Sequence, residues 1–498
     1  MSRIENESGN AAESAPLLAP PDGIHGVSPR DPNSLQSAEN IESQRSSINA
    51  GNDGVASKPQ VSRTKLLPAL AVGIFLVSMD HTLIVAAYGK IGSELHALNN
   101  TSWIATSYFL TLAIFQPLYG KLCDIFGRKE CLLFAYAVFG LGCLGCGLAQ
   151  DVVQLSVARA VAGAGGGGMI SVVSILGVYC VLDLPQTDHS HWIKKLRRVD
   201  FIGGLTLGAA VFVLLFGLDN GSNRGWDKTI TIVPLAIAPA LFVLFVVVEG
   251  KVAKEPFAPR HVIFDPPLLA AYGAAFFGVA VQLAVLFFSP LFFQAALAFS
   301  ATTTGLIYLP STFCALAGSL TGGFMIKRVG RYYWLTTCGY MIMFLGGIPM
   351  AVGAGLQSAL VVAIGLSILQ FGVSISLTTG LVAIIANATP ADTPVAIACS
   401  YLFRTLGTNL GIGVTTATLQ QMLRVNLARE LGGADRAQEI EEGVRLSLDY
   451  IRRLDPDVAV IVRECYAVAT QWAFAPAAGF AVIAIASSLF IREKKLER

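Results

Sequence analysis

The sequence contains little charge. Only 14% of its 498 residues are charged, 54% are hydrophobic, and the mean hydropathy is +0.61. These values lie outside the range of soluble globular chains. The net charge is only +2, so the charge balance gives no sign of a nucleic-acid partner. The chain is therefore expected to lie in a lipid bilayer.

Three sequence features that would indicate other roles are also missing. The glycine run in Leu155–Gly168 (LSVARAVAGAGGGG) lacks a following Gly-Lys-Ser/Thr, which excludes a phosphate-binding loop for ATP. Cys143 and Cys146 form a C-x-x-C without a second pair, and their apolar surroundings favour packing over metal or redox chemistry. The first 62 residues lack the apolar core of a signal peptide, so the first span must act as the targeting signal. We expect a protein without enzymatic activity and without a metal.

Apolar runs of about 20 residues, the length that crosses a bilayer, recur along most of the chain. Each run is expected to be helical, because backbone groups cannot stay unpaired in lipid. The sequence therefore predicts an all-α integral membrane protein with about twelve spans. The twelve runs are 67–88, 103–120, 131–149, 154–183, 200–218, 230–248, 268–294, 304–326, 332–354, 359–387, 395–421 and 470–491.

Basic residues gather in alternate loops, which the positive-inside rule places in the cytoplasm. These loops are Gly120–Lys129, Lys194–Arg198, Lys327–Arg331 and the C-terminal residues 492–498. The short opposite loops, HALNNTS, DNGSNRGWDK, AFSATTT and GLQS, contain few Lys or Arg residues. The longest outside segment, 424–469, is mixed in charge and is predicted to carry an amphipathic surface helix. Asn99 and Asn100 lie on this side and fit the pattern of a glycosylation acceptor.

The N-terminal residues 1–62 are rich in Ser, Asn, Glu and Pro and are predicted to form a disordered cytoplasmic tail. Within the tail, the segment ESAPLL has the form of an acidic dileucine sorting signal, with Glu13 four residues before Leu17 and Leu18. Such signals route proteins to the vacuole or lysosome, and this one would bind a sorting adaptor. A short, loosely defined pattern also matches by chance, and that alternative stays open.

The loop GKLCDIFGRK resembles the signature loop between the second and third spans of the major facilitator superfamily. Positive charge alone would anchor the topology, whereas an aspartate and two glycines require another explanation. In that family the acidic residue and the arginine form a contact that latches two helix bundles together. The resemblance assigns this latch to Gly120, Asp124, Gly127, Arg128 and Lys129, with Gly120 allowing close helix approach and Gly127 a tight turn.

A second copy of the loop, GFMIKRVGR, begins at Gly323, 203 residues after Gly120. It repeats the spacing with Gly330 and Arg331, but Lys327 stands at the acidic position. Secondary transporters are built from such repeats, with the substrate site between the halves near the bilayer midplane. We therefore expect a major facilitator fold of two helical bundles related by a pseudo-repeat.

Other segments resemble the fungal vacuolar basic amino acid transporters, which belong to the fourteen-span drug:proton antiporter branch of the superfamily. They include SMDHTLIVAAYGKIGSEL, ATSYFLTLAIFQPLYGKL and YLFRTLGTNLG, while LSVARAVAGAGGGG resembles the fourth-span motif of the superfamily as a whole. The resemblance covers roughly residues 65–491. It implies that a proton gradient, with no cofactor, drives lysine, histidine or arginine into the vacuole. Drug or toxin efflux at the plasma membrane remains an alternative, as does a truncated, non-transporting remnant or a solute sensor.

With twelve predicted spans, the chain is two spans shorter than this branch, and the expected gap falls at the junction Ile175–Val178. The run 154–183 then fuses parts of two spans into a helix of about 45 Å. The expected domains are a shortened N-terminal bundle at 63–200, two linker spans and a loop at 201–266, and a C-terminal bundle at 267–491 that includes the outside loop 424–469.

Three ionisable residues within spans are candidates for the substrate and proton site: Asp80, Arg159 and Arg404. Charges inside the bilayer are costly and usually functional. Asp80 in particular could exchange a proton for a cationic substrate. The structural alternative is that these residues pair with one another or with backbone carbonyls. Amides that could line a polar path, or simply bond between helices, are Gln116, Gln282, Asn387 and Asn409.

Overall fold

A computed structural model describes most of the chain from Leu76 to Lys494. The gaps are 78, 81–82, 85–86, 88, 182–200, 252–259, 390–391, 432–439, 441–442, 445 and 452. The chain divides into two units, Met1–Ser62 and Arg63–Arg498, and every described residue belongs to the second. The proposed sorting signal, with Glu13, Leu17 and Leu18, lies outside the described residues.

The described residues form helices and connecting turns, without a strand among them. Two short elements interrupt the α-helices, the 3-10 turn η1 (Leu98–Asn100) and the π-helical turn η2 (Phe292–Ala296). The remaining elements are α3 (Ser102–Phe126), α4 (Arg128–Leu148), α5 (Val152–Val181), α7 (Phe201–Arg224), α8 (Thr229–Lys251), α9 (Arg260–Ile263), α10 (Pro266–Leu291), α11 (Ala301–Val329), α12 (Tyr333–Gly355), α13 (Ala359–Asn387), α14 (Thr393–Glu430), α16 (Leu448–Ile451) and α17 (Pro456–Leu489).

Eight helices in the described part of the chain are long and apolar enough to cross a membrane, with mean hydropathies from 1.3 to 2.7. They are α4, α7, α8, α10 with η2, α11, α12, α13 and α17. All fall on apolar runs of the sequence, which confirms the all-α membrane class. The total of twelve spans stays a prediction. Helix α5 runs without interruption through Ile175–Val178, and its 30 residues correspond to about 45 Å.

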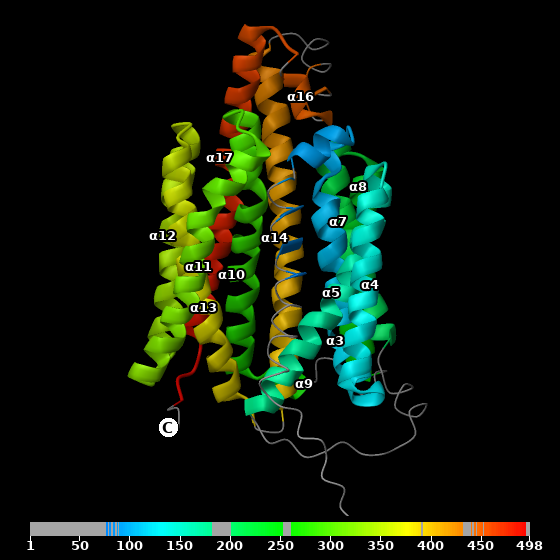
Figure 1. Ribbon diagram of the computed structural model, residues 1–498, viewed down its shortest axis with the longest axis vertical. Helices are drawn as coiled ribbons and strands as arrows, with labels where there is room; N and C mark the ends of the chain where they lie inside the picture. The colour runs from blue at the N-terminus through cyan, green and yellow to red at the C-terminus, as the bar shows by residue number, and fades with distance from the viewer. Residues whose placement is uncertain are drawn as a thin grey trace, which may run out of the picture. The chain divides into compact units, whose positions relative to one another are not determined.

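The long helices pack in two groups (Figure 1). Helices α3 and α4 both pack on α5, whereas α10 to α14 and α17 pack among themselves. Helices α7 and α8 form a hairpin, and α7 contacts both α3 and α14. Buried apolar side chains of α3, α7 and α14 form a cluster of their own at this place. The linker helix α7 therefore bridges the two groups.

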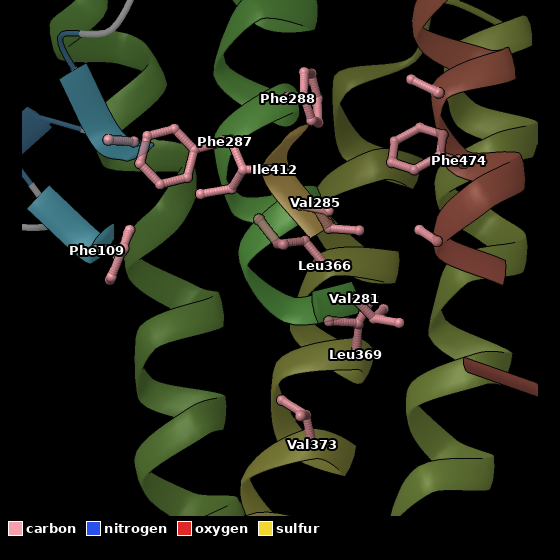
Figure 2. Close-up of a cluster of buried hydrophobic side chains, with 14 of the residues drawn as sticks. Phe109, Val281, Val285, Phe287, Phe288, Leu366, Leu369, Val373, Ile412 and Phe474 are labelled. Atoms are coloured by element: carbon pink, nitrogen blue, oxygen red, sulfur yellow. The ribbon is translucent and has the colours of Figure 1, made fainter. Parts of the chain in front are cut away.

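Figure 2 shows buried side chains of the second group. Val281 and Val285 of α10 lie beside Leu369 and Leu366 of α13, and Phe288 lies further along α10. Phe474 of α17 completes the same apolar cluster. In a bilayer such packing is driven by close fit rather than by exclusion of water. Close apolar packing therefore holds α10 against α13 and α17.

The two signature loops both turn at a glycine with positive φ. Gly127 has φ of 92° and is the single residue between α3 and α4, and Gly330 has φ of 69° at the end of α11. Residues with a Cβ rarely adopt this conformation. Gly323 lies on an exposed surface of α11, while its neighbour Gly322 packs against Ile375 of α13. The side chains of Asp124 and Arg128 lie outside the described residues, so their latch role stays a prediction.

The helices around residues 424–469 are longer than the apolar runs predict. Helix α14 continues to Glu430, and α17 already begins at Pro456. Between them the structure describes the short helix α16 and helical residues at 440, 443–444 and 446. The helices continue because side chains such as Leu427 and Val462 are fully buried there. Packing between helices thus extends beyond the stretch that hydropathy detects.

Candidate substrate and proton site

Asp80 and Arg159 form an ion pair between the first span and α5. The Arg159 Nη1 donates to both carboxylate oxygens of Asp80, at 2.8 Å to Oδ1 and 2.7 Å to Oδ2. The Arg159 side chain is only 3% exposed and that of Asp80 17% exposed. Two charges are stable in such a place only when they offset each other. The structure thus realises the pairing that the sequence left open for these two residues.

Arg159 has further partners on α3. Its Nε donates to the carbonyl of Ile104 at 3.4 Å, and its guanidinium carbon lies 4.3 Å from the centre of the Tyr108 ring. A cation over an aromatic ring is attracted by the electron-rich face. Arg159 is therefore held by Asp80, Ile104 and Tyr108, and its side chain also forms a hydrogen bond with Cys146.

The pair lies near the end of the bundle that is opposite the basic loops. Arg159 follows the first residue of α5, Val152, by seven residues, or about 10 Å. Ile104 is the third residue of α3, which begins at the same end. By the positive-inside rule, this end faces away from the cytoplasm.

The glycine run of α5 creates the close packing around the pair. A Cβ on Gly163 or Gly166 would collide with the carbonyl or hydroxyl of Tyr108, and one on Gly165 would collide with the backbone of Phe139 in α4. Small residues of this kind let helix backbones approach in membranes. The run therefore fixes Tyr108 beneath Arg159 and is not a phosphate-binding loop.

Arg404 lies apart from the pair, on α14. Its Nη2 donates to the carbonyl of Leu377 in α13 at 3.1 Å, and its guanidinium carbon lies 5.3 Å from the ring centre of Tyr401. Its Nε has no hydrogen-bond partner among the residues that the structure describes. The structure brings together Asp80 and Arg159, and it places Arg404 in the second helix group without an acidic partner in the described part of the chain.

Three of the four candidate amides, Gln116, Asn409 and Asn387, fall into two places. Near the centre, Thr405 of α14 lies 3.5 Å from Gln116 of α3, a long contact between the two groups. Asn409 donates to the carbonyl of Thr405 in the same region. At the end with the basic loops, Asn387 donates to the hydroxyl of Tyr332 and to the carbonyl of Arg492. Asn387 therefore joins helix ends and the C-terminal segment.

Hydrogen bonds close the end of the bundle opposite the basic loops. Asn223 of α7 donates to Asn100 of η1 at 3.1 Å, and its carbonyl accepts from Arg424 of α14 at 2.8 Å. The backbone N–H of Leu448 donates to Ser93 of the first span at 2.7 Å. Asn99 and Asn100, the predicted glycosylation acceptors, both lie in η1 and are partly buried. These bonds join both helix groups through α7 and α16.

At the basic end, Asp392 connects the start of α14 to α9. It accepts from Thr389 at 2.7 Å and lies 3.2 Å from the His261 ring. The bond from Thr389, and next the one from His261, lower the pKa of Asp392 below its usual value. Asp392 thus stays ionised at neutral pH.

Sequence reasoning missed two residues. Tyr108 is fully buried against Arg159, but one aromatic residue within an apolar run gives no sign of that role. Glu249 of α8 is 7% exposed, although it follows the run 230–248 and resembles a loop residue in the sequence. In the structure, α8 continues to Lys251, so Glu249 lies within the helix.

Comparison with known proteins identifies the class. The Major Facilitator Superfamily profile matches residues 70–177. The crystal structure of a bacterial homologue of the human lysosomal transporter Spinster, in an inward-facing and unoccupied conformation, has a TM-score of 0.58 and 17% identity. The structural match covers 88% of this chain and 98% of the bacterial protein. This likeness shows the fold.

Fungal relatives narrow the identification. The chain is 30% identical to the vacuolar membrane amino acid uptake transporter fnx2 of Schizosaccharomyces pombe, over 88% of this chain and 85% of the relative. It is 30% identical to the multidrug resistance protein fnx1 of the same yeast, over 87% and 95%. It is 25% identical to the vacuolar basic amino acid transporter 1 of Saccharomyces cerevisiae, over 87% and 93%.

The chain therefore belongs to the major facilitator superfamily. It is a transporter of small molecules and not an enzyme. Its membrane-spanning helices and its vacuolar relatives support an integral protein of the vacuolar membrane. The resemblance to fungal vacuolar transporters is confirmed, while the number of spans, the substrate and the coupling ion are expectations from the sequence.

Proposed function

We propose that the protein carries basic amino acids from the cytosol into the vacuole in exchange for protons, by alternating access. The observation that carries the proposal is the buried ion pair between Asp80 and Arg159. The names of two relatives, one a vacuolar amino acid uptake transporter and one a vacuolar basic amino acid transporter, supply the substrate class. The proton gradient is the energy source in this scheme.

The chemistry of exchange follows from the competition for one carboxylate. Arg159 contacts both oxygens of Asp80 in this state. A proton on Asp80, or the cationic side chain of a bound lysine, would offset the carboxylate equally well. Binding of either the proton or the lysine side chain requires Arg159 to move away from Asp80. Ile104 and Tyr108 would still contact the Arg159 guanidinium after this movement. Proton and substrate therefore exclude each other, which is the requirement for antiport.

Alternating access requires each end of the protein to open in turn. Hydrogen bonds through Asn223 and Ser93 close the end that we assign to the vacuolar lumen. Opening this end would break these bonds, while Asp124 and Arg128 would latch the cytoplasmic end. Arg404, which has no acidic partner in the described residues, is a second candidate for contact with the substrate carboxylate.

Multidrug efflux is the alternative, because one relative of 30% identity is named a multidrug resistance protein. An Asp80 that accepts cations would also suit cationic drugs. A truncated remnant or a solute sensor is the third possibility, because the N-terminal bundle is expected to be two helices short.

Transport by the purified chain in proteoliposomes tests the proposal. With an acidic interior, we expect labelled lysine to accumulate, and we expect accumulation to collapse when a protonophore removes the gradient. Drug uptake without lysine uptake would favour efflux. The absence of both, with lysine binding retained, would favour a sensor.

A further inference from the structure

A polar cleft lies at the end of the bundle that is opposite the basic loops. Its volume is about 390 Å³. The cleft is lined by Lys90, Ser93 and Glu94 at the end of the first span, just beyond the apolar run 67–88, by η2 and the start of α11, and by α16 and α17. The polar side chains that matter here are Lys90, Ser93, Glu94, Gln294, Asp449 and Arg463.

The cleft is lined by Arg463 of α17. The Nε of Arg463 is buried and has no hydrogen-bond partner within the described residues. Leaving a buried donor unpaired costs about 1–3 kcal/mol, and more for a charged group. A carboxylate is the natural partner, because it matches the planar fork of arginine. The arginine side chain in the wall of the cleft therefore favours a ligand with a carboxylate.

The cleft also offers charges of both signs. On the first span, Lys90 Nζ lies 3.6 Å from Glu94 Oε1, and on the other side α16 supplies Asp449 and α17 supplies Arg463. A free amino acid carries one carboxylate and one ammonium group, so each of its charges finds an opposite charge here. The volume is also within the range of about 300–1,000 Å³ that is typical of small-molecule pockets.

Both helix groups contribute to the cleft. The first span lines one side, and residues of η2, α16 and α17 line the other. A Cβ on Gly89 would press on Gln294 and Leu448, and the Leu448 N–H donates to Ser93, so the two sides are held in contact here. A ligand that binds both sides favours the state in which this end is closed, in proportion to its differential affinity.

We propose that this cleft is a lumenal binding site for free α-amino acids, which inhibits transport when the vacuole is full. Arg463 binds the α-carboxylate, and the acidic side chains Glu94 and Asp449 receive the α-ammonium. Occupation holds the lumenal end closed and slows each further cycle. The inference rests on the proposed function, because it takes the substrate class and the lumenal side from it.

The first experiment measures lysine uptake into proteoliposomes preloaded with glycine. Glycine has both charges of the backbone but no cationic side chain to compete at Asp80. Uptake by the native protein should fall several-fold relative to empty vesicles, and Arg463→Gln should remove the effect. Arg429→Gln is the control, because it removes an exposed arginine near the same end but outside the cleft. Equal inhibition of native protein and Arg463→Gln would overturn the proposal, as would no inhibition of the native protein.

A second experiment separates this proposal from the proposed function, because it needs no transport. Glycine should raise the melting temperature of the purified full chain, and Arg463→Gln should abolish the shift while Arg463→Lys keeps part of it. An equal shift with inorganic phosphate would mean a simple anion site and would overturn the assignment. A glycine shift in a chain that does not move lysine would support the binding site and contradict only the transport proposal.

Discussion

At the scale of single residues, the ion pair between Asp80 and Arg159 has two possible meanings. It could be a packing device, because each charge neutralises the other inside the bilayer. It could also be the exchange site, because one carboxylate then has three competing partners. The two meanings predict different behaviour when both charges are removed together.

Replacement of Asp80 by Asn is expected to leave Arg159 buried and unpaired. Breaking a buried pair from one side typically costs about 3–5 kcal/mol. The melting temperature of the purified protein should fall, and proton-driven lysine uptake should be lost. Asp80→Glu keeps the charge and should retain part of the uptake.

The double variant Asp80→Asn/Arg159→Gln separates the two meanings. It should recover much of the stability because no charge is left unpaired. Uptake should stay absent if the carboxylate exchanges proton and substrate. Uptake that returns with stability, and with unchanged pH dependence, would show that the pair serves packing alone.

At the scale of helices, the glycine run of α5 determines how closely α3 and α4 approach. Gly163 and Gly166 leave room for Tyr108, and Gly165 leaves room for the backbone of Phe139. Overpacking such a contact typically costs about 1–3 kcal/mol. The ion pair between Asp80 and Arg159 depends on the contact between α3 and α5, because Ile104 and Tyr108, which hold the Arg159 side chain, both belong to α3.

Gly166→Ala should therefore lower both stability and transport. Its methyl group would collide with the Tyr108 hydroxyl and displace the ring from Arg159. Gly140→Ala on α4 is the matched control, because nothing lies within 4 Å of its added Cβ. Thermal unfolding and lysine uptake of the two variants should differ clearly. Equal behaviour would mean that the α3–α5 contact is looser than the structure shows.

The sequence predicts the helices well because apolar length alone decides them in a bilayer. The same reasoning misjudges the ends of α14 and α17, which continue as packed helices beyond the apolar runs. It also selects Asp80, Arg159 and Arg404 as unusual charges. It cannot decide which of them pair, because Asp80 and Arg159 are far apart in the chain and only the packing of the first span, α3 and α5 brings them together.

At the scale of the whole transporter unit, the linker helix α7 has a role that its position in the sequence does not suggest. It contacts both α3 and α14, and its apolar side chains share a cluster with Ala113 and Leu402. Its last turn supplies Asn223, which bonds to Asn100 and to Arg424. A helix expected to be a connector therefore fastens the two groups at the end opposite the basic loops.

This closure should have to open once in every transport cycle. We expect a short bifunctional thiol reagent to bridge Asn100→Cys and Asn223→Cys, because the two side chains lie within hydrogen-bond distance, 3.1 Å between Nδ2 and Oδ1. The bridged double variant should lose lysine uptake and recover it when a reductant cleaves a reducible linker. Each single variant, treated in the same way, controls for reaction at the native cysteines and should keep its uptake. Undiminished transport by the bridged protein would show that residues 100 and 223 stay together throughout the cycle. The contact that opens would then have to lie between α7 and α14, where Arg424 donates to the Asn223 carbonyl.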